Sequence, residues 1–162
     1  MLTSRDMQTI EFLEQYKIAR TTTIAKILYP SLRVAQRRLK VLFDAKEVKR
    51  YADAETDEFI YFIKKPKQVL HSLLVTEFYR YMIENYNVEK FKIEVELDTI
   101  RPDAMFRYNN NGKKYLGVLE VEISNNGTTP EKYDTYKDVE LQAWFIKRGG
   151  TNFYKNFSLE KI

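Results

Sequence analysis

The sequence predicts an α+β fold in two parts, and three observations lead to this prediction. Apolar residues recur at helical spacing in three segments within residues 3–44, and the second of these segments is short. A strand–turn–strand pattern follows and ends at residue 63. An amphipathic helix over 68–86 then leads into several strand-like segments. We therefore expect a first domain over 1–66 and a small α/β domain over 67–162.

Composition excludes several classes of protein. The 162 residues contain no cysteine and a single histidine, so a disulfide scaffold, thiolate zinc sites and cysteine catalysis are excluded. A His-rich metal centre is excluded for the same reason. No apolar run approaches the length of about 18 residues that a membrane span needs, so no membrane association is expected. The N-terminal segment has no apolar signal core, which predicts a cytoplasmic location.

Capping residues set the expected ends of the first three helices. Thr3 or Ser4 is expected to cap the first helix. After a break at 18–20, Thr21-Thr22-Thr23 is expected to cap the second helix, which ends at Tyr29-Pro30 because proline disfavours helix in the residue before it. Ser31 is expected to cap the third helix, which runs to about Asp44.

The third helix presents two different stripes. The apolar stripe, expected to face the core, consists of Leu32, Ala35, Leu39 and Leu42. The polar stripe lies roughly a third of a turn away and consists of Arg33, Gln36, Arg37 and Lys40. Arginine pairs with guanine acceptors and glutamine with adenine, so the polar stripe has the chemistry of a helix that reads the major groove.

Three helices followed by a hairpin over 48–63 are the parts of a winged helix-turn-helix, in which the second helix of the motif enters the major groove. The segment Lys17–Arg50 supports a nucleic-acid partner, since it holds ten basic residues against two acidic ones. The candidate DNA-binding residues are Thr21, Thr22, Thr23, Arg33, Gln36, Arg37, Lys40, Lys49 and Arg50, with the threonines, Lys49 and Arg50 expected at phosphates. A solvated basic face, or a module that binds another protein, remains the alternative.

The second part is expected to contain strands over 91–97, 101–108 and 115–123. A helix over 130–141 and one or two final strands, over 143–146 and 152–157, complete the prediction.

Three acids resemble those of a PD-(D/E)xK nuclease core. Asp103 follows Pro102, and Glu120 and Glu122 lie on the third of these strands. The resemblance implies that Asp103 and Glu120 hold Mg²⁺ or Mn²⁺, which prefer carboxylate oxygens. It also implies a lysine two places after the second acid, where this chain has Glu122; Lys132 is the candidate substitute. The implied catalytic set is Asp103, Glu120, Glu122 and Lys132. The alternative is that Glu120 and Glu122 are ordinary strand acids.

The order of parts resembles the replication–relaxation family of plasmids and mobile elements. The resemblance is carried by Arg101–Phe106, Leu119–Glu122 and Lys132–Tyr136. It implies a DNA-binding accessory role in plasmid replication, mobilisation or their regulation, with double-stranded DNA and replication or mobilisation proteins as partners. A homodimer is compatible with it. Two other functions stay open: a Mg²⁺- or Mn²⁺-dependent DNA endonuclease, and a protein-interaction module of a replication or transfer complex.

Overall fold

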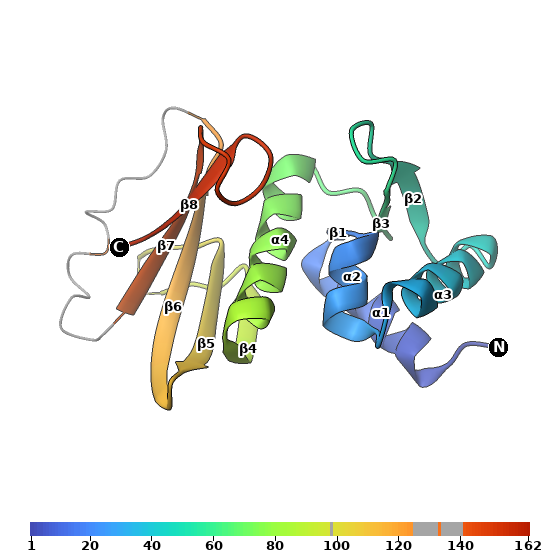
Figure 1. Cartoon of the computed structure of the whole chain (residues 1–162), viewed down its shortest axis with the longest axis horizontal. Coiled ribbons are helices and arrows are strands. Elements are labelled where there is room, and N and C mark those ends of the chain that lie inside the picture. Colours follow the sequence, from blue (N-terminus) through green and yellow to red (C-terminus); the bar gives the residue numbers. More distant parts are fainter. Residues whose placement is uncertain (98, 125–132, 134–140) are drawn as a thin grey trace. The chain divides into compact units, whose positions relative to one another are not determined.

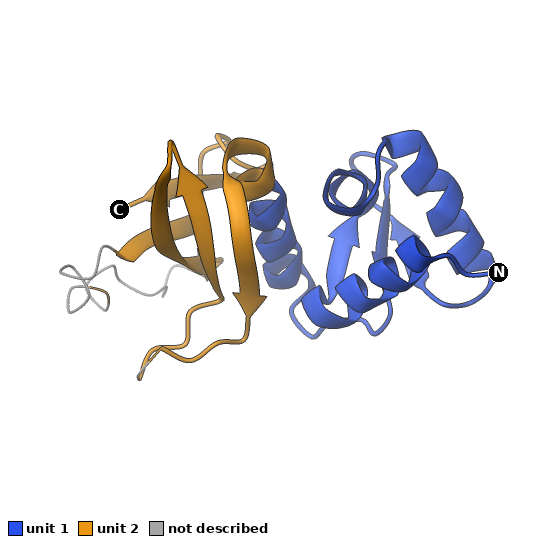
Figure 2. Ribbon diagram, turned by 90° about the horizontal axis from the view of Figure 1, so that it is seen from below, with its two compact units in different colours: residues 1–80 blue, residues 81–162 orange. Residues whose placement is uncertain are grey.

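The computed structural model describes residues 1–97, 99–124, 133 and 141–162, which form a mixed α+β fold with two sheets (Figure 1). The chain divides into two compact units, unit 1 (Met1–Arg80) and unit 2 (Tyr81–Ile162), coloured separately in Figure 2. The division falls inside helix α4 (Val69–Asn85), whereas the sequence placed a boundary between residues 66 and 67. Within the described residues, no helix combines the length and the apolar character needed to cross a membrane.

Unit 1 combines three helices with a small antiparallel sheet. Its elements are α1 (Ser4–Tyr16), β1 (Ile18–Arg20), α2 (Thr21–Leu28), α3 (Leu32–Asp44), β2 (Lys49–Ala52), β3 (Phe59–Phe62) and the first part of α4. The strand order is β1-β3-β2, with β3 in the centre. The sheet is thus built from one strand between the first two helices and a hairpin after the third.

Side-chain caps fix the starts of α1 and α3 where the sequence predicts them. Thr3 caps α1 in a capping box with Asp6, in which each side chain bonds the backbone N–H of the other. Ser31 caps α3 and accepts a hydrogen bond from the Val34 N–H at 3.2 Å.

The start of α2 differs from the prediction in two ways. The segment Ile18–Arg20, expected as a break, is strand β1, because it pairs along its length with β3. The three threonines expected as a cap lie inside the first turn, and the N-cap is Arg20, whose side chain makes no capping bond. Glu58, which lies in the hairpin, caps the helix instead, since its Oε1 accepts a hydrogen bond from the Thr22 N–H at 2.6 Å.

The first part of α4 belongs to unit 1 because it covers the sheet. Leu73 packs with Ile18 of β1 and Ile60 of β3 in one apolar cluster. Thr76, also buried, donates a hydrogen bond from Oγ1 to the Ile18 carbonyl at 3.0 Å. These contacts explain why the division of the chain follows residue 80 and not the end of the hairpin.

Unit 2 is built on a five-stranded mixed sheet. Its strands are β4 (Asn87–Ile93), β5 (Ala104–Asn110), β6 (Lys113–Glu122), β7 (Leu141–Arg148) and β8 (Phe157–Lys161), in the order β4-β5-β6-β7-β8. Strands β6 and β7 are parallel and the other pairs are antiparallel. The strand expected over 152–157 instead begins at Phe157. The helix expected over 130–141 falls almost entirely outside the described residues.

Both faces of this sheet are apolar near its centre. On one face, the Tyr86 ring lies 5.0 Å from Tyr108 and 6.1 Å from Trp144, between ring centroids. On the other face, Val118, Ala143 and Phe145 form a buried cluster with Tyr133. Burial on both faces is typical of a sheet that includes a parallel pair with a crossover connection.

Candidate nucleic-acid interface

Helix α3 separates its two predicted stripes, with one exception in the apolar stripe. The side chains of Ala35, Leu39 and Leu42 are buried in the core of unit 1. The exposed residues include the whole polar stripe, Arg33, Gln36, Arg37 and Lys40. Leu32 departs from the prediction: it lies in the first turn of α3 and is 42% exposed.

The polar stripe carries more positive charge than its surroundings neutralise. Lys40 pairs with Asp44, the only acid of α3, at 2.7 Å, but both side chains are more than half exposed. Such a surface pair is weak. Arg33 and Arg37 form no ion pair within the described part of the chain.

Arg38, on the same helix, has a structural task instead. Its guanidinium makes a two-point contact with the fully buried carboxylate of Asp6, through Nε at 3.1 Å and through Nη2. The hydrogen bonds from Arg38 hold the pKa of Asp6 below its usual value, although burial opposes the shift. This pair fixes α3 against α1, and so fixes the direction in which the polar stripe faces.

The threonines expected at phosphates are engaged within the protein. Thr21 is buried and donates from Oγ1 to the Phe59 carbonyl at 2.6 Å. Thr23 has no exposed surface and donates to Glu77 Oε1 at 2.5 Å. Thr22 donates to Glu58 through its hydroxyl as well as its N–H. Their hydroxyls therefore hold α2 to the hairpin and to α4.

Arg20 completes this polar network at the start of α2. Its guanidinium pairs with Glu58 at 2.7 Å and with Glu77 at 3.2 Å. Burial raises the pKa of Glu77 despite these contacts. Burial alone would also raise the pKa of Glu58, but the hydrogen bonds from Thr22 and Arg20 outweigh it, and that pKa is lowered.

Lys49 and Arg50, at the start of the hairpin, have different surroundings. Lys49 is exposed. The Arg50 guanidinium lies between two rings, 3.9 Å from the centroid of Phe43 and 3.9 Å from that of Phe59. It also donates to the Tyr61 hydroxyl at 3.3 Å. Arg50 thus joins α3 to the sheet, a contact that its position in the sequence does not reveal.

The turn between β2 and β3 is acidic. Residues 53–58 carry four carboxylates and no basic side chain: Asp53, Glu55, Asp57 and Glu58. Asp53 shapes the turn, since it accepts hydrogen bonds from the Glu55 N–H at 3.4 Å and the Thr56 hydroxyl at 2.9 Å. Glu55 and Asp57 are exposed. The tip of the hairpin therefore carries the opposite charge to α3.

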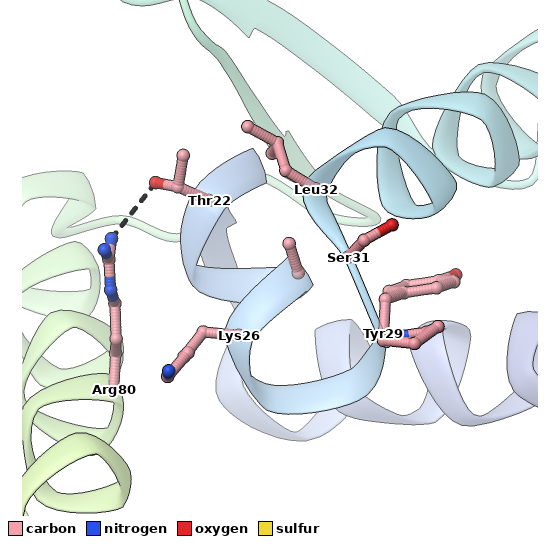
Figure 3. A pocket seen from close by; sticks show the side chains of 8 residues that line it. Thr22, Lys26, Tyr29, Ser31, Leu32 and Arg80 are labelled. Atoms are coloured by element: carbon pink, nitrogen blue, oxygen red, sulfur yellow. Dashed lines mark hydrogen bonds between the residues drawn. The ribbon is translucent and has the colours of Figure 1, made fainter.

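A hollow of about 380 Å³ lies at the turn between α2 and α3 (Figure 3). Tyr29, Ser31 and Leu32 line it together with two basic residues, Lys26 and Arg80. Arg80 donates from Nη1 to the Thr22 hydroxyl at 3.1 Å. Sequence reasoning missed both basic residues. Lys26 is an ordinary polar position in the predicted second helix, so no motif marks it. Arg80 belongs to α4, which is distant in sequence from α2 and α3.

The predicted metal ligands of unit 2, Asp103 and Glu120, lie beside each other in the sheet, one just before β5 and one on β6. Asp103 directly precedes β5, and the pairing of Ala104 with Leu119 sets it opposite Glu120. Asp103 Oδ2 accepts a hydrogen bond from the Val121 N–H at 2.7 Å, and buried Glu120 accepts one from the Tyr133 hydroxyl. Both carboxylates are thus bonded to neighbouring protein groups.

The remaining members of the predicted catalytic set add little to this pair. Glu122 follows on the same face of β6, two residues beyond Glu120. Lys132 lies outside the described residues. Among the residues that the structure describes, no three acids or histidines gather closely enough to hold a metal ion.

Comparisons with known proteins give no match. No protein-family model matches the chain, and no curated protein or solved structure matches it either.

Proposed function

We propose that unit 1 is a winged helix-turn-helix that binds double-stranded DNA through the polar stripe of α3. The observation that carries the proposal is the exposure of Arg33, Gln36, Arg37 and Lys40 together on one face of α3, beside the face on which Ala35, Leu39 and Leu42 are buried. The element order supports it, since a short α2, then α3, then a hairpin is the order expected of such a module.

The surroundings of α3 refine the set of contacts. Lys49 is exposed and remains a candidate at a phosphate. We add Lys26 and Arg80 to the candidate phosphate contacts. Both line the hollow beside the N-terminal end of α3, which is the end expected to enter the major groove. Thr21, Thr23 and Arg50 act as supports of the interface, because their polar groups are engaged internally.

The biological role proposed for this binding rests on the resemblance to the replication–relaxation family. We propose an accessory role in replication or mobilisation of a plasmid or mobile element, or in its regulation. The proposal does not extend to a metal-dependent endonuclease, because among the described residues no group of three acids or histidines gathers closely enough to hold a metal ion.

Fluorescence anisotropy with a labelled random-sequence duplex, measured across a salt series, tests the proposal. Arg33→Glu with Arg37→Glu is expected to weaken binding by about 10-fold or more and to reduce the slope of log affinity against log salt by about 2. The control is Lys64→Glu with Lys67→Glu, which changes net charge equally at two exposed positions outside α3.

The control variant is expected to keep most of the affinity. Equal losses in the two variants would mean that net charge alone drives binding. No binding by the unmodified protein, even at low salt, would refute the proposal and favour the protein-interaction module.

A further inference from the structure

Unit 2 carries a compact basic patch that the proposed function does not use. The patch consists of Lys90 and Lys92 on β4 and Arg107 on β5, and all three side chains are exposed. Lys90 lies directly opposite Arg107 in the strand pairing, and Lys92 is opposite Met105 on the same face. Three basic side chains therefore share one small area of the sheet surface, on the neighbouring strands β4 and β5.

A shift in the strand register brings these charges together. Val88 pairs with Tyr108, but the next paired residue is Lys90, so Glu89 is skipped. In an unshifted register Glu89 would lie opposite Arg107, and the two would attract each other. The shift instead pairs Phe91 with Phe106 in the core, where both are buried. Burial of Phe91 explains the shift, and its consequence is a lysine opposite an arginine.

The positive charges of this patch are not neutralised by acidic side chains among the described residues. Lys92, and after it Arg107, lower the pKa of Lys90, as expected for like charges close together. Glu89 reaches away to Lys114, at 3.5 Å. In the part of the chain that the structure describes, no carboxylate forms an ion pair with Lys90, Lys92 or Arg107. Like charges directly opposite each other destabilise a sheet, so an external anion would relieve the repulsion.

From this juxtaposition we infer that the β4–β5 face around Lys90, Lys92 and Arg107 binds the sugar–phosphate backbone of a nucleic acid. The three exposed side chains lie on the edge strand β4 and its neighbour β5, which suits an extended polyanion better than a small anion. Lys90 and Lys92 are two residues apart along a strand, a distance of about 6.6 Å, so the patch covers more than one phosphate group. The inference goes beyond the proposed function, because it gives unit 2 its own contact.

The test uses full-length variants in the anisotropy assay described for α3. Lys90→Glu with Lys92→Glu and Arg107→Glu is expected to reduce the salt slope by about 3 and to weaken binding of the random duplex by about 10-fold or more. Together with Arg33→Glu and Arg37→Glu, the effects on log affinity are expected to add, as for separate contact sites. Lys64→Glu with Lys65→Glu and Lys67→Glu, at three exposed positions outside the patch, controls for the same change in net charge.

The two proposals fail in different ways. If the α3 variant loses affinity and the patch variant does not, the inference about unit 2 is overturned and the proposed function stands. If the patch variant alone loses affinity, the inference stands and the proposed function fails. Vesicles of phosphatidylserine provide a further arm. If the patch variant loses binding to vesicles but keeps its binding to duplex, the nucleic-acid assignment is wrong.

A neutral variant separates binding from folding. Lys90→Gln with Lys92→Gln and Arg107→Gln removes both the attraction to phosphate and the internal repulsion. It is expected to bind DNA more weakly while showing a higher urea midpoint than the unmodified protein. A lower midpoint would contradict the repulsion argument, and unchanged DNA binding would overturn the inference.

Discussion

The variant Arg50→Ala tests whether Arg50 stabilises the fold or contacts DNA. The guanidinium lies 3.9 Å from each of two ring centroids, Phe43 and Phe59. A cation–π contact at an accessible site contributes about 0.5–1 kcal/mol, so the two together contribute about 1–2 kcal/mol. Arg50→Ala is therefore expected to lower the free energy of unfolding by about 1–2 kcal/mol, measured by urea denaturation with circular dichroism.

Lys49→Ala is the matched control in the same strand. Because Lys49 is exposed and forms no ring contact in the described residues, its loss is expected to change stability by less than about 0.5 kcal/mol. In the DNA assay the order reverses: Lys49→Ala reduces the salt slope by about 1, and Arg50→Ala leaves it unchanged. If Arg50→Ala kept full stability and reduced the salt slope, the structural role derived from the ring contacts would be refuted.

Two further predictions concern packing and pH. Gly117→Ala would bring a Cβ into the ring of Phe106, overlapping Cε2 and Cζ, so a loss of about 1–3 kcal/mol is expected in urea denaturation. In the double variant, Phe106→Leu is expected to recover part of the stability lost through Gly117→Ala. If the two losses in unfolding free energy simply add, the clash with the Phe106 ring is contradicted. Burial raises the pKa of Glu77 above 4.5, so the folded state holds this proton more tightly and ionisation of Glu77 costs stability as pH rises. Glutamine cannot ionise, so the stability of the Glu77→Gln variant relative to the unmodified protein is expected to increase from pH 4.5 upward. Urea midpoints of the two proteins that change in parallel with pH would contradict this.

The sequence predicts those elements of unit 1 that depend on local signals. The cap at Thr3 and the two stripes of α3 follow from spacing within a few residues. Strand β1 has three residues and forms because β3, distant in the chain, offers a partner. No local pattern marks so short a strand. Glu58 likewise replaces the expected threonine cap of α2 from across the unit.

The candidate site shows the same division between local and long-range information. The exposure of Arg33 and Arg37 could be predicted from helical periodicity alone. The roles of Arg38 and Arg50 could not, because each depends on a partner from another element, Asp6 for one and Phe59 for the other. In unit 2, the alternation of β4 predicts a polar face. It does not predict the skipped residue that decides whether an acid or a lysine faces Arg107.

The acidic turn between β2 and β3 gives unit 1 an electric dipole moment. The positive part is the α3 stripe with Arg33 and Arg37, and the negative part is the turn with Glu55 and Asp57, all exposed. In the field of a polyanion such a dipole experiences a torque that turns the α3 end inward before contact. The turn would thus act during the diffusional approach, by reducing the fraction of encounters that begin with the wrong surface. It would also keep the hairpin tip away from the phosphates once α3 is seated.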